Sequence, residues 1–165
     1  MTDFRVRELR EEDLAVVGEL TVAANIPYEP AGSSYFDLLR DVRPRFEDAY
    51  ANIVVETDDG RVVGAVNLST SENEFAHVAT EGEVEMRMLA VDPAFHRQGV
   101  GTLIVRSVQR KAQEAGFERV VLSSRKNMTN AHRMYEKCGF QLAPERFWEP
   151  TPGLEVLVYV WPCSH

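Results

Sequence analysis

Residues 88–103 read MLAVDPAFHRQGVGTL, and the rest of the chain is best understood outward from them. The run starts as the apolar end of a predicted strand, turns at Pro93, and passes through a short loop that carries Gly99 and Gly101. From Val100 onward, apolar residues recur at the spacing of an amphipathic helix, so both glycines lie at the helix start. Helix starts have unpaired backbone N–H groups and a partial positive charge, which suit an anion such as phosphate. The stretch therefore predicts a pyrophosphate cradle, with a plain tight turn as the alternative.

Two common nucleotide-binding motifs do not fit this loop. A P-loop ends in Gly-Lys-Ser/Thr, which the stretch lacks. A dinucleotide-binding fingerprint needs a third glycine at position 104, where the chain has Ile104. The predicted cradle is therefore of another kind.

The stretch resembles the signature of the GCN5-related N-acetyltransferases. That signature is Gln/Arg-x-x-Gly-x-Gly/Ala at the end of the fourth strand, and residues 96–101 match it except at His96. The upstream segment 89–93 supports the resemblance, and the downstream segment 134–140 is similar to the family's Tyr-Glu-x-x-Gly-Phe. The three segments occur in the family's order over residues 83–142. The resemblance implies that acetyl-CoA donates an acetyl group to a primary amine by direct attack.

The predicted fold is a single domain, residues 1–165, of the mixed α/β class. The resemblance implies one mixed, mostly antiparallel sheet of about seven strands flanked by helices. Residue patterns predict strands at 4–9, 53–56, 62–68, 83–91, 117–123, 140–142 and 154–161. They predict helices at 11–24, 33–40, 45–50, 100–115 and 127–138. The proline-rich residues 143–153 are predicted to form a loop.

The resemblance also assigns the cofactor-binding residues. The pantetheine arm of acetyl-CoA would pair with Leu89, Ala90 and Val91, and the amide of Leu89 would polarise the thioester carbonyl. Arg97 would add charge to the cradle. The amides that would hold the pyrophosphate belong to Arg97, Gln98, Gly99, Val100, Gly101 and Thr102.

Two residues are the catalytic candidates that the resemblance implies. Glu85 would take a proton from the amine, because strand alternation places it on the face of Leu89 unless a bulge intervenes. A salt bridge within the sheet is the competing role of Glu85, and Glu83 is the reserve base. Tyr135 would protonate the departing thiolate, with a core tyrosine as the alternative. Ser123 and Ser124 could hydrogen-bond the cofactor or the acceptor, but no base is spaced to activate either.

The acceptor itself is not encoded in a local motif. Tyr28 and Tyr35 lie in the segment that helps to wall the acceptor site in the resembled family, although packing in the core is the more common role of an aromatic ring. Two other functions stay open. One is a non-catalytic acyl-CoA binding or sensing module, and the other is an acyltransferase that uses a different acyl donor or an oxygen acceptor.

Composition narrows the partners. A net charge of −8 argues against nucleic acid and would attract a cationic amine weakly. The two cysteines and four histidines have no metal-ligand spacing, so no metal is expected. No signal core and no run of about 20 apolar residues is present, so we expect a cytoplasmic protein without a membrane partner. A homodimer through the last strands is left open.

Overall fold

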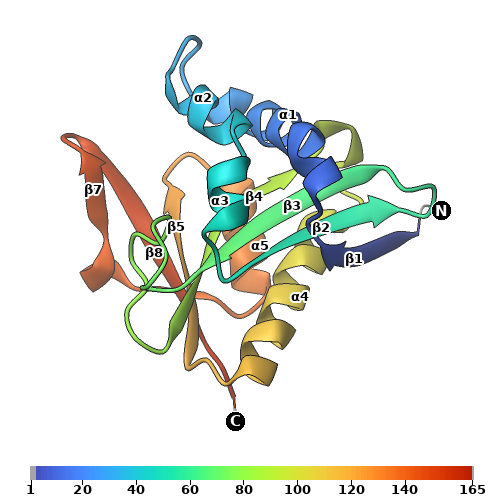
Figure 1. The fold of residues 1–165 in the computed structure, drawn as a ribbon. Helices are drawn as coiled ribbons and strands as arrows, with labels where there is room; N and C mark the ends of the chain where they lie inside the picture. The colour runs from blue at the N-terminus through green and yellow to red at the C-terminus, as the bar shows by residue number, and fades with distance from the viewer. Residues whose placement is uncertain (1–2, 165) are drawn as a thin grey trace.

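The computed structural model describes residues 3–164, and its centre is one twisted sheet between two layers of helices (Figure 1). The strands are β1 (Phe4–Glu8), β2 (Ala51–Thr57), β3 (Val62–Ser69), β4 (Glu83–Val91), β5 (Arg119–Arg125), β6 (Gln141–Leu142), β7 (Trp148–Thr151) and β8 (Leu154–Pro162). The α-helices are α1 (Leu14–Asn25), α2 (Tyr35–Arg40), α3 (Arg43–Glu47), α4 (Val100–Ala115) and α5 (Thr129–Lys137). Short 3-10 turns precede α1 at Glu11–Asp13 and α4 at Pro93–Phe95.

The sheet has eight strands in the order β1-β2-β3-β4-β5-β8-β6, with β7 paired to β8. Neighbours are antiparallel except for β4 and β5, which run parallel and are connected through α4. This confirms the mixed, mostly antiparallel α/β class, with one strand more than expected. The additional strand is β7, which forms within the predicted loop 143–153 because Trp148 and Thr151 pair with β8 across a turn.

Apolar side chains form a core on each face of the sheet. The face covered by α4 and α5 buries the larger cluster, which includes Val100, Ile104 and Phe140. The face covered by α1 and α3 buries a smaller one, which includes Val17 and Leu20. Burial of these apolar groups is the main term that holds the helices against the sheet.

A β-bulge at Met88 interrupts the alternation of β4. Asn67 of β3 lies opposite Arg87, but Ala65, two residues away, lies opposite Ala90, so β4 holds one extra residue. Met88 takes a φ of 56°, an uncommon value for a residue with a side chain. Beyond the bulge, Leu89 packs with the cluster under α4, whereas Ala90 belongs to the cluster under α1. Glu85 and Leu89 therefore do not share a face, which corrects the alternation expected from the sequence.

The β4–β5 ladder stops halfway along β4. Its last pair is Met86 with Leu122, whereas β5 continues to Arg125 in its ladder with β8. Residues 87–91 of β4 pair only with β3 and present their other backbone edge to the gap. The two parallel strands thus separate where the predicted site begins.

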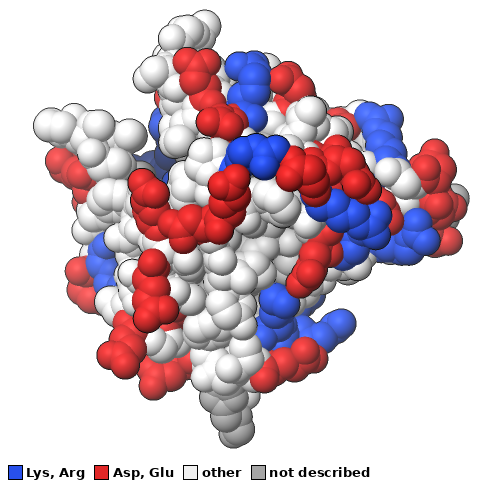
Figure 2. All heavy atoms as spheres, viewed as in Figure 1, with Lys and Arg blue, Asp and Glu red and all other residues white. Residues whose placement is uncertain are grey.

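Acidic side chains are spread across the face drawn in Figure 2, with basic side chains among them, as the net charge of −8 suggests. None of the helices within residues 3–164 is long and apolar enough to cross a membrane.

Candidate active site

The start of α4 presents an exposed loop of backbone amides beside the end of β4. Gly99 adopts a φ of 84°, and a Cβ there would have no heavy atom within 4 Å. Arg97 also has a positive φ, 63°, and its guanidinium has no partner among residues 3–164. The first intrahelical bond links the Leu103 amide to the Gly99 carbonyl at 2.9 Å, so the amides of residues 100–102 are open to an anion. This geometry is consistent with the predicted cradle.

A glycine is needed at position 101 for helix packing, and not for ligand access as the sequence suggested. A Cβ at this position would lie 2.8 Å from Sδ of Met134 and 3.7 Å from Cγ2 of Val91. The missing side chain therefore lets α5 pack closely on α4, instead of clearing space for a ligand. Gly99 is the glycine whose Cβ direction is open.

An open cavity of about 410 Å³ occupies the gap between β4 and β5. Its floor is residues 86–89 of β4 and 122–125 of β5, and Tyr135 of α5 lines it as well. Tyr35 and Leu39 of α2 form one wall, and Trp148 of β7 and Leu154 of β8 form another. A volume of this size suits a small ligand, and its lining combines apolar side chains with polar and charged ones such as His77, Arg87 and Ser124.

Tyr135, the proton donor expected from the resemblance, lines the cavity from α5. Its ring is 7% exposed and packs against Tyr159 and Phe140 at centroid distances of 5.7 and 5.9 Å. Its hydroxyl has no hydrogen-bond partner among the described residues. Burial raises the pKa of Tyr135 well above its usual value, so the phenol keeps its proton at neutral pH.

Glu85 is fully buried and does not line the cavity. Its Oε1 accepts hydrogen bonds from the amides of His77, Val78 and Ala79 at 2.9, 2.8 and 3.0 Å. Its Oε2 is buried with no hydrogen-bond partner in the described chain. The carboxylate therefore anchors the loop between β3 and β4, and one oxygen is left free to accept a proton.

Glu83, the reserve base, belongs to an ion-pair cluster. Its carboxylate contacts Arg119 at 2.7 Å and Arg146 at 2.8 Å, and accepts the Thr80 amide. Burial alone would raise the pKa of Glu83, but hydrogen bonds from Arg146 and Arg119 outweigh it and hold that pKa at about 2. Such a carboxylate is a weak base, and it does not line the cavity.

Ser124 lies in the cavity beside a histidine that the sequence did not associate with it. Nε2 of His132 is 3.0 Å from the Ser124 hydroxyl and 3.0 Å from the carbonyl of Arg125. A carbonyl only accepts, so these contacts assign the proton to Nε2, which then donates to Ser124 as well. His132 therefore cannot remove the serine proton through Nε2. Their spacing of eight residues, across the end of β5 and the start of α5, is no known local signal.

Of the two tyrosines expected at the acceptor site, only one lines the cavity. Tyr35 lines the cavity, and its ring lies under the guanidinium of Arg125 at 5.9 Å. Tyr28 does not line the cavity and accepts a hydrogen bond from Arg125 through its backbone carbonyl at 3.3 Å. Glu29 completes the group with an ion pair to Arg125 at 2.6 Å.

Several cavity residues were missed by sequence reasoning. Arg87 and His77 line the cavity, and so does Trp148, whose indole N–H donates to Ser123 at 3.0 Å. The alternation of β4 did place Arg87 on the face of Glu85, but nothing local marked His77 or Trp148. Within residues 3–164, no group of three acidic, histidine or cysteine side chains is arranged to hold a metal ion.

Strands β4 and β5 thus separate beside an exposed helix start, and the cavity lies in the gap between them. The sequence model of the acetyltransferase (GNAT) family matches residues 14–140, so the chain belongs to that family. No curated protein sequence shows significant similarity to the chain.

Solved structures give the same fold at low identity. The ribosomal-protein-S18-alanine N-acetyltransferase from Escherichia coli superposes with a TM-score of 0.73 at 18% identity, covering 99% of this chain and 96% of that one. A putative phosphinothricin N-acetyltransferase gives a TM-score of 0.76 at 18% identity, with 99% and 100% covered. A GNAT family acetyltransferase from Brucella melitensis, solved with acetyl-CoA, gives 0.69 at 19% identity, with 99% and 90% covered.

Proposed function

We propose that this acetyltransferase moves the acetyl group of acetyl-CoA to a primary amine by direct attack. The observation that carries the proposal is the gap between β4 and β5, which joins the exposed amides of α4 to the cavity that holds the Tyr135 hydroxyl. A binding module without chemistry would not need a proton donor in this position.

The residues present fit acetyl-CoA. Amides of residues 97–102 would hold the pyrophosphate, with the unpaired Arg97 adding charge. The free backbone edge of Leu89, Ala90 and Val91 would pair with the amide groups of the pantetheine arm. The bound thioester would supply an activated acetyl group and a thiolate leaving group.

The chain's own groups then have separate tasks. The Leu89 amide stabilises negative charge on the carbonyl oxygen as the amine attacks. The Tyr135 hydroxyl, kept protonated by burial, donates its proton to the sulfur as the C–S bond breaks. The carboxylate of Glu85 takes the proton of the attacking nitrogen through water, because its free Oε2 lies outside the cavity lining.

The test compares wild type with Tyr135→Phe, which removes the hydroxyl and keeps the ring packing. We expect thiol release from acetyl-CoA, measured against a panel of primary amines, to fall about 100-fold in kcat because the thiolate loses its proton donor. The affinity for acetyl-CoA, measured by calorimetry, should stay within a factor of two or so, since the cradle is untouched. Equal turnover in the two proteins would remove the acid role, and absence of acetyl-CoA binding by the wild type would overturn the proposed function.

A further inference from the structure

The cavity holds more positive than negative charge. Arg87 and Arg125 line it, whereas Glu29 is the one carboxylate among its lining residues. Glu29 is already paired with Arg125 at 2.6 Å, and that guanidinium also lies over the ring of Tyr35. The charge of Arg125 is therefore compensated within the protein, and that of Arg87 is not.

Arg87 has few partners for a guanidinium. Its Nη1 donates to the carbonyl of Phe75 at 2.5 Å, and no carboxylate within residues 3–164 lies within ion-pair distance of it. Glu85 shares its face of β4, but that carboxylate is turned to the amides of residues 77–79. A guanidinium has five N–H donors, so most of those on Arg87 remain available to a ligand.

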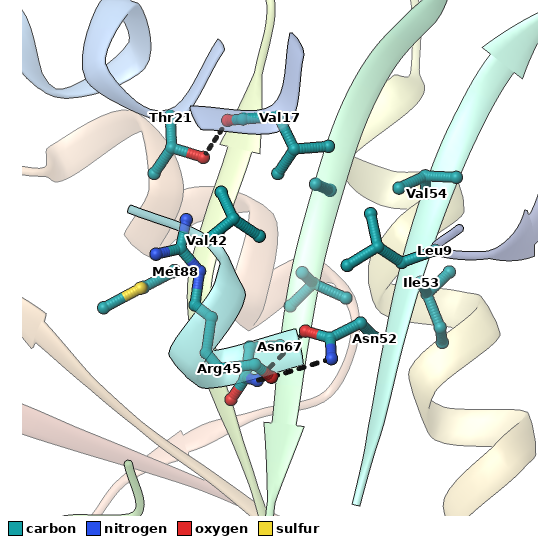
Figure 3. A pocket seen from close by; sticks show the side chains of 12 residues that line it. Leu9, Val17, Thr21, Val42, Arg45, Asn52, Ile53, Val54, Asn67 and Met88 are labelled. Atoms are coloured by element: carbon teal, nitrogen blue, oxygen red, sulfur yellow. Dashed lines mark hydrogen bonds between the residues drawn. The ribbon is translucent and has the colours of Figure 1, made fainter. Parts of the chain in front are cut away.

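A second arginine without a carboxylate partner in the described chain lies near Met88, one of the cavity's lining residues. Arg45 of α3 extends toward Met88, which lines both the cavity and the small pocket of Figure 3. Arg45 is 3% exposed, and its guanidinium donates to the carbonyls of Leu38, Leu39 and Asp41, with no carboxylate partner in the described chain. Burial lowers the pKa of Arg45 to about 10, and the positive charge of Arg87 adds to the effect. Burial and the same charge also lower the pKa of His77.

We infer that the acceptor is an amine that also carries a carboxylate, as an α-amino acid does, and that Arg87 binds this carboxylate. The inference rests on the proposed acetyl transfer and names its acceptor class. Arg87 and Leu89 lie on either side of the Met88 bulge and both line the cavity, so the Arg87 side chain can meet a carboxylate whose neighbouring amine lies at the Leu89 end. A guanidinium can bind the two oxygens in a bidentate pair.

The charge of the cavity and the net charge of the molecule favour different acceptors. A net charge of −8 would draw polyamines to the surface, but the excess positive charge in the cavity repels an acceptor with several ammonium groups. Beside its polar residues, the lining includes apolar ones such as Leu39, Met86 and Leu154. Amino acids with apolar side chains are therefore the first acceptors to test.

The experiment measures kcat/KM with acetyl-CoA for L-leucine, L-phenylalanine and L-methionine, each against its amino acid amide, with spermidine as a polycation. The amide keeps the skeleton and lacks the carboxylate, and its weaker basicity leaves more free amine at neutral pH, so chemical reactivity favours the amide. We expect at least one amino acid to exceed its amide in kcat/KM and spermidine to react least. We expect Arg87→Gln to raise the KM for that amino acid about 10- to 100-fold, the value of one charge-assisted hydrogen bond. Arg87→Lys should restore part of the loss, and Arg110→Gln, which removes an exposed charge on α4, should change nothing.

Binding gives a readout that does not depend on turnover. Tryptophan fluorescence, which includes Trp148 in the cavity, reports binding of the amino acid to the protein saturated with CoA. Amino acid binding that is lost in Arg87→Gln and kept in Arg110→Gln supports the inference even if turnover is slow. If amides or spermidine react as well as the amino acids, and Arg87→Gln matches wild type, the inference is wrong while acetyl transfer stands. If acetyl-CoA neither binds nor reacts, the proposed function fails instead.

Discussion

At the scale of single residues, the two buried carboxylates of β4 do different work although they are two positions apart. Glu83 is compensated by two arginines, whereas Glu85 is held by three backbone amides and retains one free oxygen. In both cases hydrogen bonds compensate a buried carboxylate, which would be costly without partners. Of the two, only Glu85 has an oxygen without a hydrogen-bond partner in the described chain, and its other oxygen anchors the loop 77–79.

Two substitutions separate the roles of Glu85. In Glu85→Gln an amide oxygen still accepts the three N–H groups, so the free energy of unfolding should change by about 1 kcal/mol at most. If Glu85 is the base, kcat should fall about 100-fold in the same protein. Glu85→Ala leaves three amides without a partner and should cost about 2–3 kcal/mol, and limited proteolysis should then cut the loop more readily. If Glu85→Gln turns over as fast as wild type, Glu85 is not the base and its role is to anchor the loop.

At the scale of elements, α4 begins and ends on glycines of the same geometry. Gly99 has a φ of 84° and Gly116 a φ of 86°, both are exposed, and a Cβ at either would meet no atom within 4 Å. Their backbone strain with a larger residue is therefore equal. They differ in that Gly99 lies at the positive end of the helix, where the pyrophosphate is proposed to bind.

This symmetry provides a matched pair of variants. Gly99→Ala and Gly116→Ala should each lower the free energy of unfolding by about 1 kcal/mol, because alanine resists the left-handed conformation. Only Gly99→Ala should weaken acetyl-CoA, by about tenfold, as the relaxed backbone misplaces an amide that faces the anion. Thermal unfolding and calorimetric titration measure the two effects. Equal acetyl-CoA affinities in the two variants would place the pyrophosphate elsewhere.

At the scale of the whole molecule, the cluster around Glu83 joins segments far apart in the chain. It connects β4 to Arg119 at the start of β5, to Arg146 after β6, and through Arg146 to the carbonyl of Val78 at 2.7 Å. The cluster thus fixes the loop over the site relative to the sheet. Its strength depends on the ionised state of one carboxylate.

Low pH should reduce the free energy of unfolding through this cluster. The pKa of Glu83 is about 2 in the fold and 4.5 in the unfolded chain, so the unfolded state binds the proton first as pH falls. The contribution, about 3 kcal/mol, is fully present above pH 4.5 and is lost as pH falls toward 2. Glu83→Gln should be less stable than wild type by about that amount at pH 7, and urea unfolding should show the two curves converging at low pH. A difference that stays constant from pH 7 to pH 3 would contradict this account.

Local patterns determined much of this protein. The strand, turn and glycine pair of residues 88–103 predicted the helix start and its exposed amides, and the resemblance of residues 134–140 to a family segment singled out Tyr135, which lines the cavity. These features depend on periodicity and on backbone groups within a few residues, so they can be recognised without the fold. The family was recognised from the resemblance of these segments to its signature, and the family model over residues 14–140 confirms it.

Only the tertiary structure decided the contents of the cavity. The bulge at Met88 moved Leu89 off the face of Glu85, β7 carried Trp148 into the lining, and Arg146 reached Glu83 across 63 residues. Arg87 stands without a carboxylate because Glu85 is bound by a loop and Glu29 by Arg125. Which charges neutralise one another depends on how distant strands and loops are brought together, and no short stretch of sequence encodes that arrangement.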